Sequence, residues 1–384
     1  MTAAGVEACD QCLRRAWLVA GLSAGIERAL GRSPSRRAQE LLALPDDELT
    51  AAVAGGEHAS VSERARARDP GRLRAAVAGA RAWARCRHHE AFPGGLGRLA
   101  DAPPVLFGRG DPALLTSLVS DGCVTVVGAR RPSSYGRELA TLLGRELGSA
   151  RLCLVSGMAL GIDSCAHEGA LEAGGFTVAV LGSGPDVPHP VRMRRLYERI
   201  VEHGLVLSEL PPGTGPRRWT FPARNRIMAA LSAMTVVVEG RERSGSLITA
   251  ALAVEAGREV GAVPGRVGAA TASGPNQLLR DGAHVIRGGQ DVLDAMVGVG
   301  VPVASGPIGT RATALPPELT AVLDEVERGA ATQDAVARAS GLDAGPVAAA
   351  LARLELAGLL SCDLAGRYTR TALAVDGRGR GRPD

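Results

Sequence analysis

The residues best suited to chemistry in this chain are arginines, glycines and serines that follow short apolar runs. Gly128 ends the β-branched run Val124–Val127, and Arg130 stands in the loop behind it. A strand, a glycine and the start of a helix present backbone N–H groups to an anion, and a guanidinium can clamp a phosphate in two places. This stretch indicates phosphate binding, with an ordinary turn carrying a solvated arginine as an equal alternative. It is not the dinucleotide-binding fingerprint, because Gly128 and Gly136 do not complete G-x-G-x-x-G.

Two further loops have the same character. One runs from Ser156 to Gly161, where Gly157 and Gly161 let the backbone approach a ligand closely. The other is Ser244-Gly245-Ser246, which opens a helix and offers a second amide-rich anion site. Each of these signals is modest alone.

Another loop combines cations with aromatic rings. Within Arg217–Arg226, four arginines interleave with Trp219 and Phe221, in a protein whose aromatic content is 3%. Single-stranded nucleic acid binds to such combinations, because cations meet its phosphates and rings stack on its bases. The alternative is a buried Trp and Phe that fix the loop. The residues that the loop contributes to the predicted nucleic-acid path are Arg218, Phe221, Arg224, Asn225 and Arg226.

Three side chains could instead serve acid–base chemistry. Asp163 and His167 share a helix face, and Glu209 follows the apolar run Leu205–Ser208. Hydrolysis of a phosphorylated small molecule would need such groups. We favour a helix cap for Asp163, a locally bonded His167, and pairing of Glu209 with an arginine of the loop.

Alternating apolar and helical patterns must position these loops. Strands are predicted at 124–127, 152–156, 177–181, 205–208, 235–239 and 260–263, with a weak seventh at 284–286. Helical patterns separate them, which predicts βα units and an α/β fold with a doubly wound, mostly parallel sheet. Ligands of such sheets bind outside the carboxyl ends of the strands, where these loops converge. The predicted phosphate-binding residues at this edge are Gly128, Arg130, Ser156, Gly157, Gly161, Arg226, Ser244, Gly245 and Ser246.

The regions around this core have patterns of their own. Before it lies an all-α region, in which Arg64–Arg87 is interpreted as a long exposed helix. A Pro- and Gly-rich segment follows this region, and one short strand is expected there at 105–107. After it, three helices and a hairpin predict a winged helix-turn-helix. The predicted domains are an N-terminal helical domain at 1–100, the core at 101–297, a linker at 298–316, the winged helix at 317–372 and a disordered tail at 373–384.

Composition narrows the class of protein. The chain has 384 residues, and 46% hydrophobic residues allow sizeable cores. The net charge of +4 is mild, so any nucleic-acid site must be a local patch. Every basic side chain other than histidine is an arginine. No apolar run approaches a membrane span or a signal-peptide core, so we expect a cytoplasmic protein without membrane contact.

The cysteines raise a separate question. There are seven, an odd and dispersed set that argues against a disulfide framework. Cys9-x-x-Cys12 and Cys86-x-His88 could together supply four zinc ligands. The gap between the two halves is long, and only one half has the tight CxxC spacing. We favour the alternative of buried small thiols and a surface Cys-Arg-His-His run, and predict no metal site.

A dense set of motifs runs along the core: Val-Gly-Ala-Arg-Arg-Pro-Ser-Ser-Tyr-Gly (127–136), Val-Ser-Gly-Met-Ala-Leu-Gly-Ile-Asp (155–163), Ala166-His167, Val180-Leu181-Gly182, Ser-Glu-Leu-Pro-Pro-Gly-Thr (208–214), Arg-Trp-Thr-Phe-Pro-Ala-Arg-Asn-Arg-Ile (218–227) and Glu-Arg-Ser-Gly-Ser-Leu-Ile-Thr-Ala (242–250). Together they resemble the DprA/Smf family of DNA-processing proteins. The resemblance covers about residues 92–296. The flanking regions are of the kinds usually attached in this family, an N-terminal helical domain and a C-terminal winged-helix domain.

The resemblance implies a protein that binds and protects single-stranded DNA and loads the RecA recombinase onto it in natural transformation. It also implies an extended Rossmann-like core that dimerises, with no catalysis and no cofactor. Carried onto matching positions, Arg130 and the glycine loops grip phosphate, and Phe221, Arg224, Asn225 and Arg226 line the DNA path. The N-terminal region departs from the family, because it lacks a Gly-rich helix–hairpin–helix pattern and carries cysteines instead.

Two other functions stay open from the residues. One is a Rossmann-like hydrolase acting on a nucleoside monophosphate, which the external arginine–aromatic loop does not require. The other, weaker, is a transcription regulator based on residues 333–353. Its recognition helix carries Arg353 but is otherwise alanine-rich, so it offers few side chains to base edges.

Overall fold

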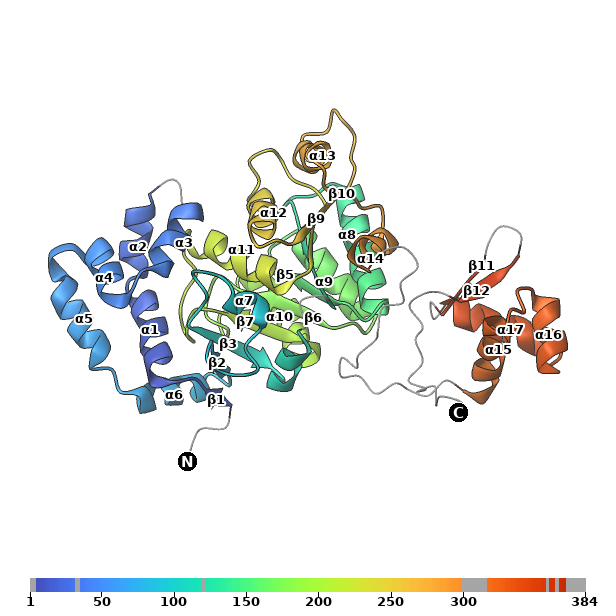
Figure 1. Ribbon diagram of the computed structural model, residues 1–384, viewed down its shortest axis with the longest axis horizontal. Helices are drawn as coiled ribbons and strands as arrows, with labels where there is room; N and C mark the ends of the chain where they lie inside the picture. The colour runs from blue at the N-terminus through green and yellow to red at the C-terminus, as the bar shows by residue number, and fades with distance from the viewer. Residues whose placement is uncertain are drawn as a thin grey trace, which may run out of the picture. The chain divides into compact units, whose positions relative to one another are not determined.

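A ten-stranded, mostly parallel sheet organises the larger part of the protein, in the order β1-β2-β3-β7-β6-β5-β4-β8-β9-β10 (Figure 1). Residue contacts divide the chain into two units, one of residues 1–148 and 152–296, the other of residues 149–151 and 297–384. The sheet belongs to the first unit. This computed structural model describes residues 5–31, 35–118, 122–297, 316–356, 359–362 and 366–370.

Short, mostly apolar runs form the strands that the sequence predicts. The parallel strands of the core are β4 (Cys123–Val127), β5 (Cys153–Ser156), β6 (Thr177–Val180), β7 (Leu205–Ser208), β8 (Met234–Val237), β9 (Glu259–Ala262) and β10 (His284–Val285). Every residue of β4 to β8 is buried, as expected for strands that are covered on both faces. The antiparallel strand β3 (Val105–Gly110) joins β7 to β2 (Trp83–Cys86), and β2 pairs in parallel with β1 (Val6–Glu7). The predicted α/β sheet is confirmed.

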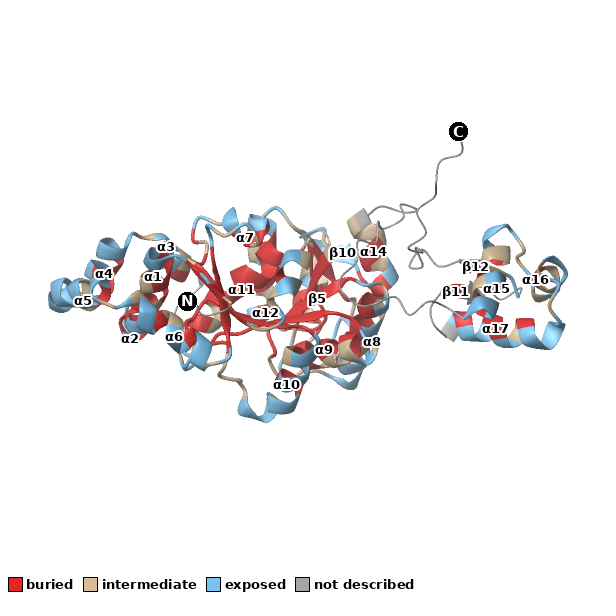
Figure 2. Ribbon diagram, turned by 90° about the horizontal axis from the view of Figure 1, so that it is seen from below, coloured by how far each residue is buried: buried red, intermediate tan, exposed pale blue. Residues whose placement is uncertain are grey.

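Helices cover both faces of the sheet (Figure 2). On one face lie α8 (Ser134–Ser149), α9 (Ile162–Glu172) and α10 (Arg194–His203), which connect β4 to β7 step by step. The chain then crosses back through α11 (Thr220–Leu231) to β8, and α11 packs with α12 (Gly245–Glu255) on the other face. The direction of winding therefore reverses between β4 and β8. The carboxyl ends of these two strands form the switch point, where open α/β sheets bind ligands.

The N-terminal region is helical as predicted, with two strands that the sequence did not reveal. Its helices are α1 (Asp10–Gly21), α2 (Ser23–Leu30), α3 (Ser35–Ala43), α4 (Asp46–Ala54), α5 (His58–Arg66) and α6 (Pro70–Gly79). The long helix suggested for Arg64–Arg87 is wrong, because α5 ends at Arg66 and the segment closes with β2. Pro70 lacks the N–H group that a continuous helix needs, and the Asp69 carboxylate accepts a hydrogen bond from Gly71 N at 2.9 Å, which starts α6 anew.

Short elements complete the first unit. They are α7 (Gly94–Gly97), the 3₁₀ turns at Gly55–Glu57, Pro112–Ser117 and Val191–Met193, and the helices α13 (Ser273–Arg280) and α14 (Gly289–Val297) near its end.

The second unit is the predicted winged helix. It contains α15 (Pro317–Glu327), α16 (Gln333–Ser340), α17 (Ala344–Leu356) and the antiparallel hairpin β11 (Leu360–Cys362) and β12 (Tyr368–Arg370). Gly341 ends α16 with a φ of 70°, a left-handed conformation that glycine adopts without strain. Leucines and valines from the three helices and from β11 form its core.

Parts of the sequence-based division lie outside the described residues. These are the predicted linker, apart from Pro316, and the predicted tail at 373–384. The domain boundaries stay predictions. Among the residues that the structure describes, no helix combines the length and the apolar character needed to cross a bilayer.

Candidate nucleic-acid interface

The start of α8, one of the predicted anion sites, already holds a carboxylate of the protein. The buried Glu239, which follows β8, accepts hydrogen bonds from Ser133 N at 2.9 Å and from Ser133 Oγ at 2.6 Å. Thr271 Oγ1 donates to the same carboxylate at 3.3 Å. A Cβ on Gly136 would lie 2.5 Å from Glu239 Oε2, so glycine is needed to admit it. The positive end of the helix is therefore compensated from within.

The loops after β4 and β5 are pressed against each other. A Cβ on Gly128 would lie 2.6 Å from Ile162 Cγ1. Gly161 has a φ of +88°, and a Cβ there would lie 2.3 Å from the carbonyl oxygen of Ala129. That oxygen accepts a hydrogen bond from Ile162 N at 3.2 Å. Close packing of the chain explains both glycines, and their contact with phosphate stays a prediction.

Arg224 and Asn225 lie beneath these loops rather than on the surface. Arg224 is 6% exposed, and its Nη1 donates to the carbonyl oxygen of Gly157 at 2.8 Å. Its Nε donates to Asn225 Oδ1 at 3.0 Å, and Asn225 Nδ2 donates to the carbonyl oxygen of Gly245 at 3.4 Å. Burial lowers the pKa of Arg224 to about 10. These two side chains link the β5 loop, α11 and the start of α12.

Arg226 is enclosed by two carboxylates. It is 2% exposed, and its Nη1 and Nη2 donate to the two oxygens of Glu209 at 2.8 and 2.7 Å. Its Nε lies 2.6 Å from Asp101 Oδ2. Burial acts to lower the pKa of Arg226, but Glu209 and Asp101 outweigh it and raise that pKa. The predicted pairing of Glu209 with a loop arginine is confirmed, whereas this geometry argues against the predicted phosphate contact of Arg226.

The acid–base candidates are also used internally. The buried carboxylate of Asp163 accepts from Gly157 N at 3.1 Å and from Ala159 N at 3.3 Å, so it holds the preceding loop and is not the predicted helix cap. His167 Nδ1 lies 2.7 Å from Thr177 Oγ1, which confirms a locally bonded histidine. Burial lowers the pKa of His167 to about 3, so its imidazole is neutral.

Arg130 and Phe221 remain at the surface and touch each other. The guanidinium carbon of the exposed Arg130 lies 5.6 Å from the ring centroid of the half-buried Phe221. The ring of His189 lies 5.6 Å from Phe221, tilted by 43°. We call these three residues the Arg130–Phe221 platform. His189 was not predicted, because a lone histidine in a Pro-rich loop carries no signal in the sequence.

A cavity of about 640 Å³ opens beside the platform. Residues of α1 and α2 and of the segment 214–218 line it together with His189 and Phe221. Arg217 Nη1 is held by Glu27 Oε2 at 3.1 Å. Arg218 is exposed, and its backbone N–H donates to Glu27 Oε1 at 3.2 Å.

Trp219 and Phe221 behave differently. Trp219 is 1% exposed, packs among the N-terminal helices and donates its Nε1–H to Ser23 Oγ at 3.2 Å. The alternative of a buried ring that fixes the loop is therefore confirmed for Trp219 and wrong for the half-exposed Phe221.

The remaining predicted loops differ in how open they are. Ser156 is buried, and its Oγ donates to the carbonyl oxygen of Val126 at 2.6 Å. Ser244 caps α12 by accepting from Ser246 N at 3.4 Å, and Ser246 is buried. Gly245 is exposed, and a Cβ on it would meet no atom within 4 Å. Of these positions Gly245 is the exposed one, and its contact with phosphate stays a prediction.

The fold and this surface define a Rossmann-like α/β protein with an attached winged helix, whose switch point carries an exposed arginine–aromatic platform. Comparison with known proteins places it more narrowly. Residues 83–297 match the family of DNA recombination-mediator protein A, and residues 309–363 match the DprA winged helix domain. The chain belongs to the DNA recombination-mediator protein A family, also called DprA/Smf.

Individual relatives agree with this assignment. The chain is 40% identical over 270 residues to the putative DNA processing protein DprA of Mycobacterium tuberculosis (strain ATCC 25618 / H37Rv), covering 68% of this chain and 67% of that protein. It is 40% identical over 205 residues to the DNA processing protein DprA of Bacillus subtilis, covering 53% of this chain and 68% of that protein. The X-ray structure of DprA from Streptococcus pneumoniae matches with a TM-score of 0.59 at 32% identity, covering 74% of this chain and 95% of that one.

Proposed function

We propose that this protein binds single-stranded DNA across the Arg130–Phe221 platform and loads a RecA recombinase onto it. Membership of a family of recombination mediators supports this role. The observation that carries the proposal is the exposed guanidinium of Arg130 over the half-buried ring of Phe221, beside an open cavity. Guanidinium groups bind phosphates and aromatic faces stack on bases without regard to sequence.

The proposed DNA path is narrower than the set of residues predicted from the sequence. It uses Arg130, Phe221 and the exposed Arg218, with the backbone at Gly245 as a second phosphate contact. Arg224, Asn225 and Arg226 support this surface from behind through their buried hydrogen bonds.

We further propose that the protein acts without catalysis, in the cytoplasm. A nucleotide hydrolase would need a carboxylate or an imidazole free to exchange a proton with a substrate. Glu209 is held by Arg226, Asp163 binds loop amides, and His167 is buried and neutral. The hydrolase alternative therefore has little support at this site.

The working form that we propose is a homodimer through the core. Within the described residues β10 pairs only with β9, which leaves one side of this edge strand open. Val285 on β10 and Val267 after β9 are exposed, at 53% and 96%. An apolar edge of this kind suits a second copy of the chain. Light scattering after gel filtration measures the molecular mass in solution and so tests for the dimer.

The test is binding of labelled oligo-dT by fluorescence anisotropy across a salt series. The logarithm of the binding constant should fall linearly with the logarithm of the salt concentration, with a slope of about −0.7 for each phosphate that is neutralised. Arg130→Ala should weaken binding and make the slope shallower, whereas Arg72→Ala, at an exposed position on α6, should change neither. A parent protein that does not bind the oligonucleotide would overturn the proposal. Assembly of RecA on the same strand, with and without this protein, then tests the loading step.

A further inference from the structure

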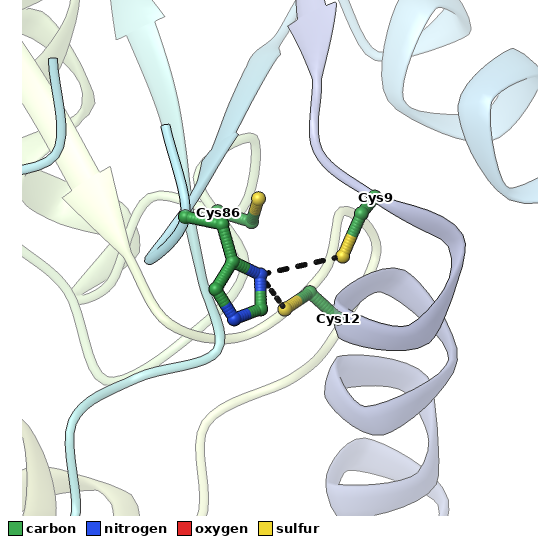
Figure 3. Close-up of side chains that lie close together, drawn as sticks. Cys9, Cys12 and Cys86 are labelled. Atoms are coloured by element: carbon green, nitrogen blue, oxygen red, sulfur yellow. Dashed lines mark hydrogen bonds between the residues drawn. The ribbon is translucent and has the colours of Figure 1, made fainter. Parts of the chain in front are cut away.

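Four ligand-type side chains meet where α1 begins and β2 ends, outside the proposed DNA path. They are Cys9, Cys12, Cys86 and His88, and one ligand atom of each lies within 4.8 Å of the others. Figure 3 shows the sulfurs of Cys9 and Cys12 turned from the start of α1 toward Cys86. We propose that these four residues bind a zinc ion in a structural Cys₃His site.

The two distances from His88 to Cys9 and Cys12 fit a tetrahedral ion. His88 Nδ1 lies 3.6 Å from Cys9 Sγ and 3.5 Å from Cys12 Sγ. Zn–S bonds of about 2.3 Å and Zn–N bonds of about 2.0–2.1 Å at tetrahedral angles place sulfur and nitrogen about 3.5 Å apart. Hydrogen bonding explains the cluster less well, because Nδ1 carries a single hydrogen or a single lone pair and so serves one sulfur at a time. A metal ion binds all four atoms together.

The fold removes the objection that the sequence raised, the long gap between the two halves. Parallel pairing of Val6 with Ala84 and of Glu7 with Arg85 brings the chain before α1 alongside the end of β2. Cys9 is the residue that precedes α1, and Cys12 lies on its first turn. Cys86 ends β2, and the hydrogen bond from His89 N to Cys86 O at 2.9 Å forms the turn that carries His88. Two short ligand pairs therefore face each other across neighbouring elements.

The chemistry of the four groups selects the metal and its role. Three thiolates and an imidazole are soft or borderline ligands, which suit zinc rather than magnesium or calcium. Protein ligands fill all four positions, as in structural rather than catalytic zinc sites. Cys12 and Cys86 are buried while Cys9 and His88 are exposed, so the ion is reached from the surface.

The site joins parts of the chain that also share a buried apolar cluster. β1 has two residues, and its Glu7 is held by Arg85 at 3.2 Å and by His89 at 2.5 Å, both through half-exposed carboxylate oxygens. Ion pairs of this exposed kind add little stability. A zinc ion bridging Cys12 and Cys86 closes a long loop of chain, which favours the folded state.

Metal analysis of the full-length protein, purified with a reductant, tests the proposal. We expect one zinc per chain in the parent and in His88→Cys, which restores a fourth ligand. Cys12→Ser and His88→Ala should lose most of it. Cys165→Ser removes a half-buried thiol on α9, outside the cluster, and should retain it. Replacement by cobalt should give the visible absorption of tetrahedral thiolate coordination in the parent, in His88→Cys and in Cys165→Ser, but not in Cys12→Ser or His88→Ala.

Stability provides a second readout that does not depend on DNA binding. A strong chelator should lower the melting temperature of the parent and of Cys165→Ser, and added zinc should restore it. A parent that contains no zinc and takes up no cobalt would overturn the proposal, as would a Cys9–Cys12 disulfide that yields no metal binding after reduction. Equal zinc in Cys12→Ser and Cys165→Ser would overturn it as well.

Discussion

The guanidinium of Arg130 lies over the ring of Phe221, with 5.6 Å between Cζ and the ring centroid. The two residues are far apart in sequence, but Arg130 follows β4 and Phe221 lies on the first turn of α11, and both elements meet at the switch point. The negative face of the ring attracts the cation. Among the described residues no carboxylate pairs with Arg130, so a phosphate can bind this guanidinium without displacing a salt bridge.

Phe221→Leu should weaken the binding of single-stranded DNA without changing its salt dependence. A leucine keeps the apolar contact but removes the stacking face, which contributes about 1–3 kcal/mol per base. No charge is lost, so the slope of log affinity against log salt should equal that of the parent. Anisotropy with oligo-dT measures both quantities. Phe221→Tyr keeps a ring and should bind like the parent, and equal affinities for the leucine variant and the parent would contradict a stacking role.

Arg226→Lys should destabilise the protein strongly, although the positive charge is kept. A lysine cannot reproduce the bidentate contact with Glu209 together with the contact to Asp101. A lysine can pair with one of the two carboxylates and leaves the other buried without its partner, which costs up to about 3–5 kcal/mol. Urea denaturation measures this loss, and Arg218→Lys, in the exposed part of the same loop, should stay within about 0.5 kcal/mol of the parent.

The opposite result for Arg226→Lys would restore the interpretation based on the sequence alone. If the variant is as stable as the parent but binds DNA poorly, Arg226 contacts phosphate after all. Urea denaturation of the variant, together with anisotropy titrations of its folded fraction with oligo-dT, decides between these outcomes.

The sheet could be predicted from the sequence because each strand from β4 to β8 is an uninterrupted buried run followed by a helical pattern. β1 and β2 escaped prediction, since β1 has two residues and β2 carries Arg85 in its middle. The edge of the sheet where the loops converge was also predictable, since it follows from the direction of parallel strands.

Which arginines face solvent could not be predicted in the same way. Arg224 and Arg226 stand in the same charged stretch as Arg218, yet α11 turns them inward toward Gly157 and Glu209. Burial of an arginine depends on carboxylates and carbonyl oxygens far away in sequence, and Asp101 lies in a segment without any regular pattern. The zinc ligands show the same limit, because only strand pairing brings Cys12 and Cys86 together.

Gly161→Ala should destabilise the protein, whereas Gly245→Ala should not. An alanine at position 161 must adopt a backbone φ of +88°, and its Cβ would lie 2.3 Å from the carbonyl oxygen of Ala129. Such backbone strain costs about 1–3 kcal/mol. At position 245 the added methyl group meets no atom, and alanine favours the helix by up to about 1 kcal/mol. Thermal denaturation of both variants measures the contrast, and equal stability of the two would contradict the packing role of Gly161.

His167 should make the stability of the protein depend on pH in mildly acidic solution. Burial lowers its pKa from 6.5 to about 3, so the unfolded chain takes up a proton below about pH 6.5 while the folded protein does not until about pH 3. The unfolded state therefore binds more protons in this window, and stability is full above it and falls as the pH decreases. The loss approaches about 1.4 kcal/mol per pH unit. His167→Gln removes this contribution, so its free energy of unfolding should fall less steeply between about pH 6.5 and pH 5 than that of the parent. His203→Gln, at an exposed histidine on α10, should keep the slope of the parent, and identical slopes for the parent and His167→Gln would show that His167 titrates normally.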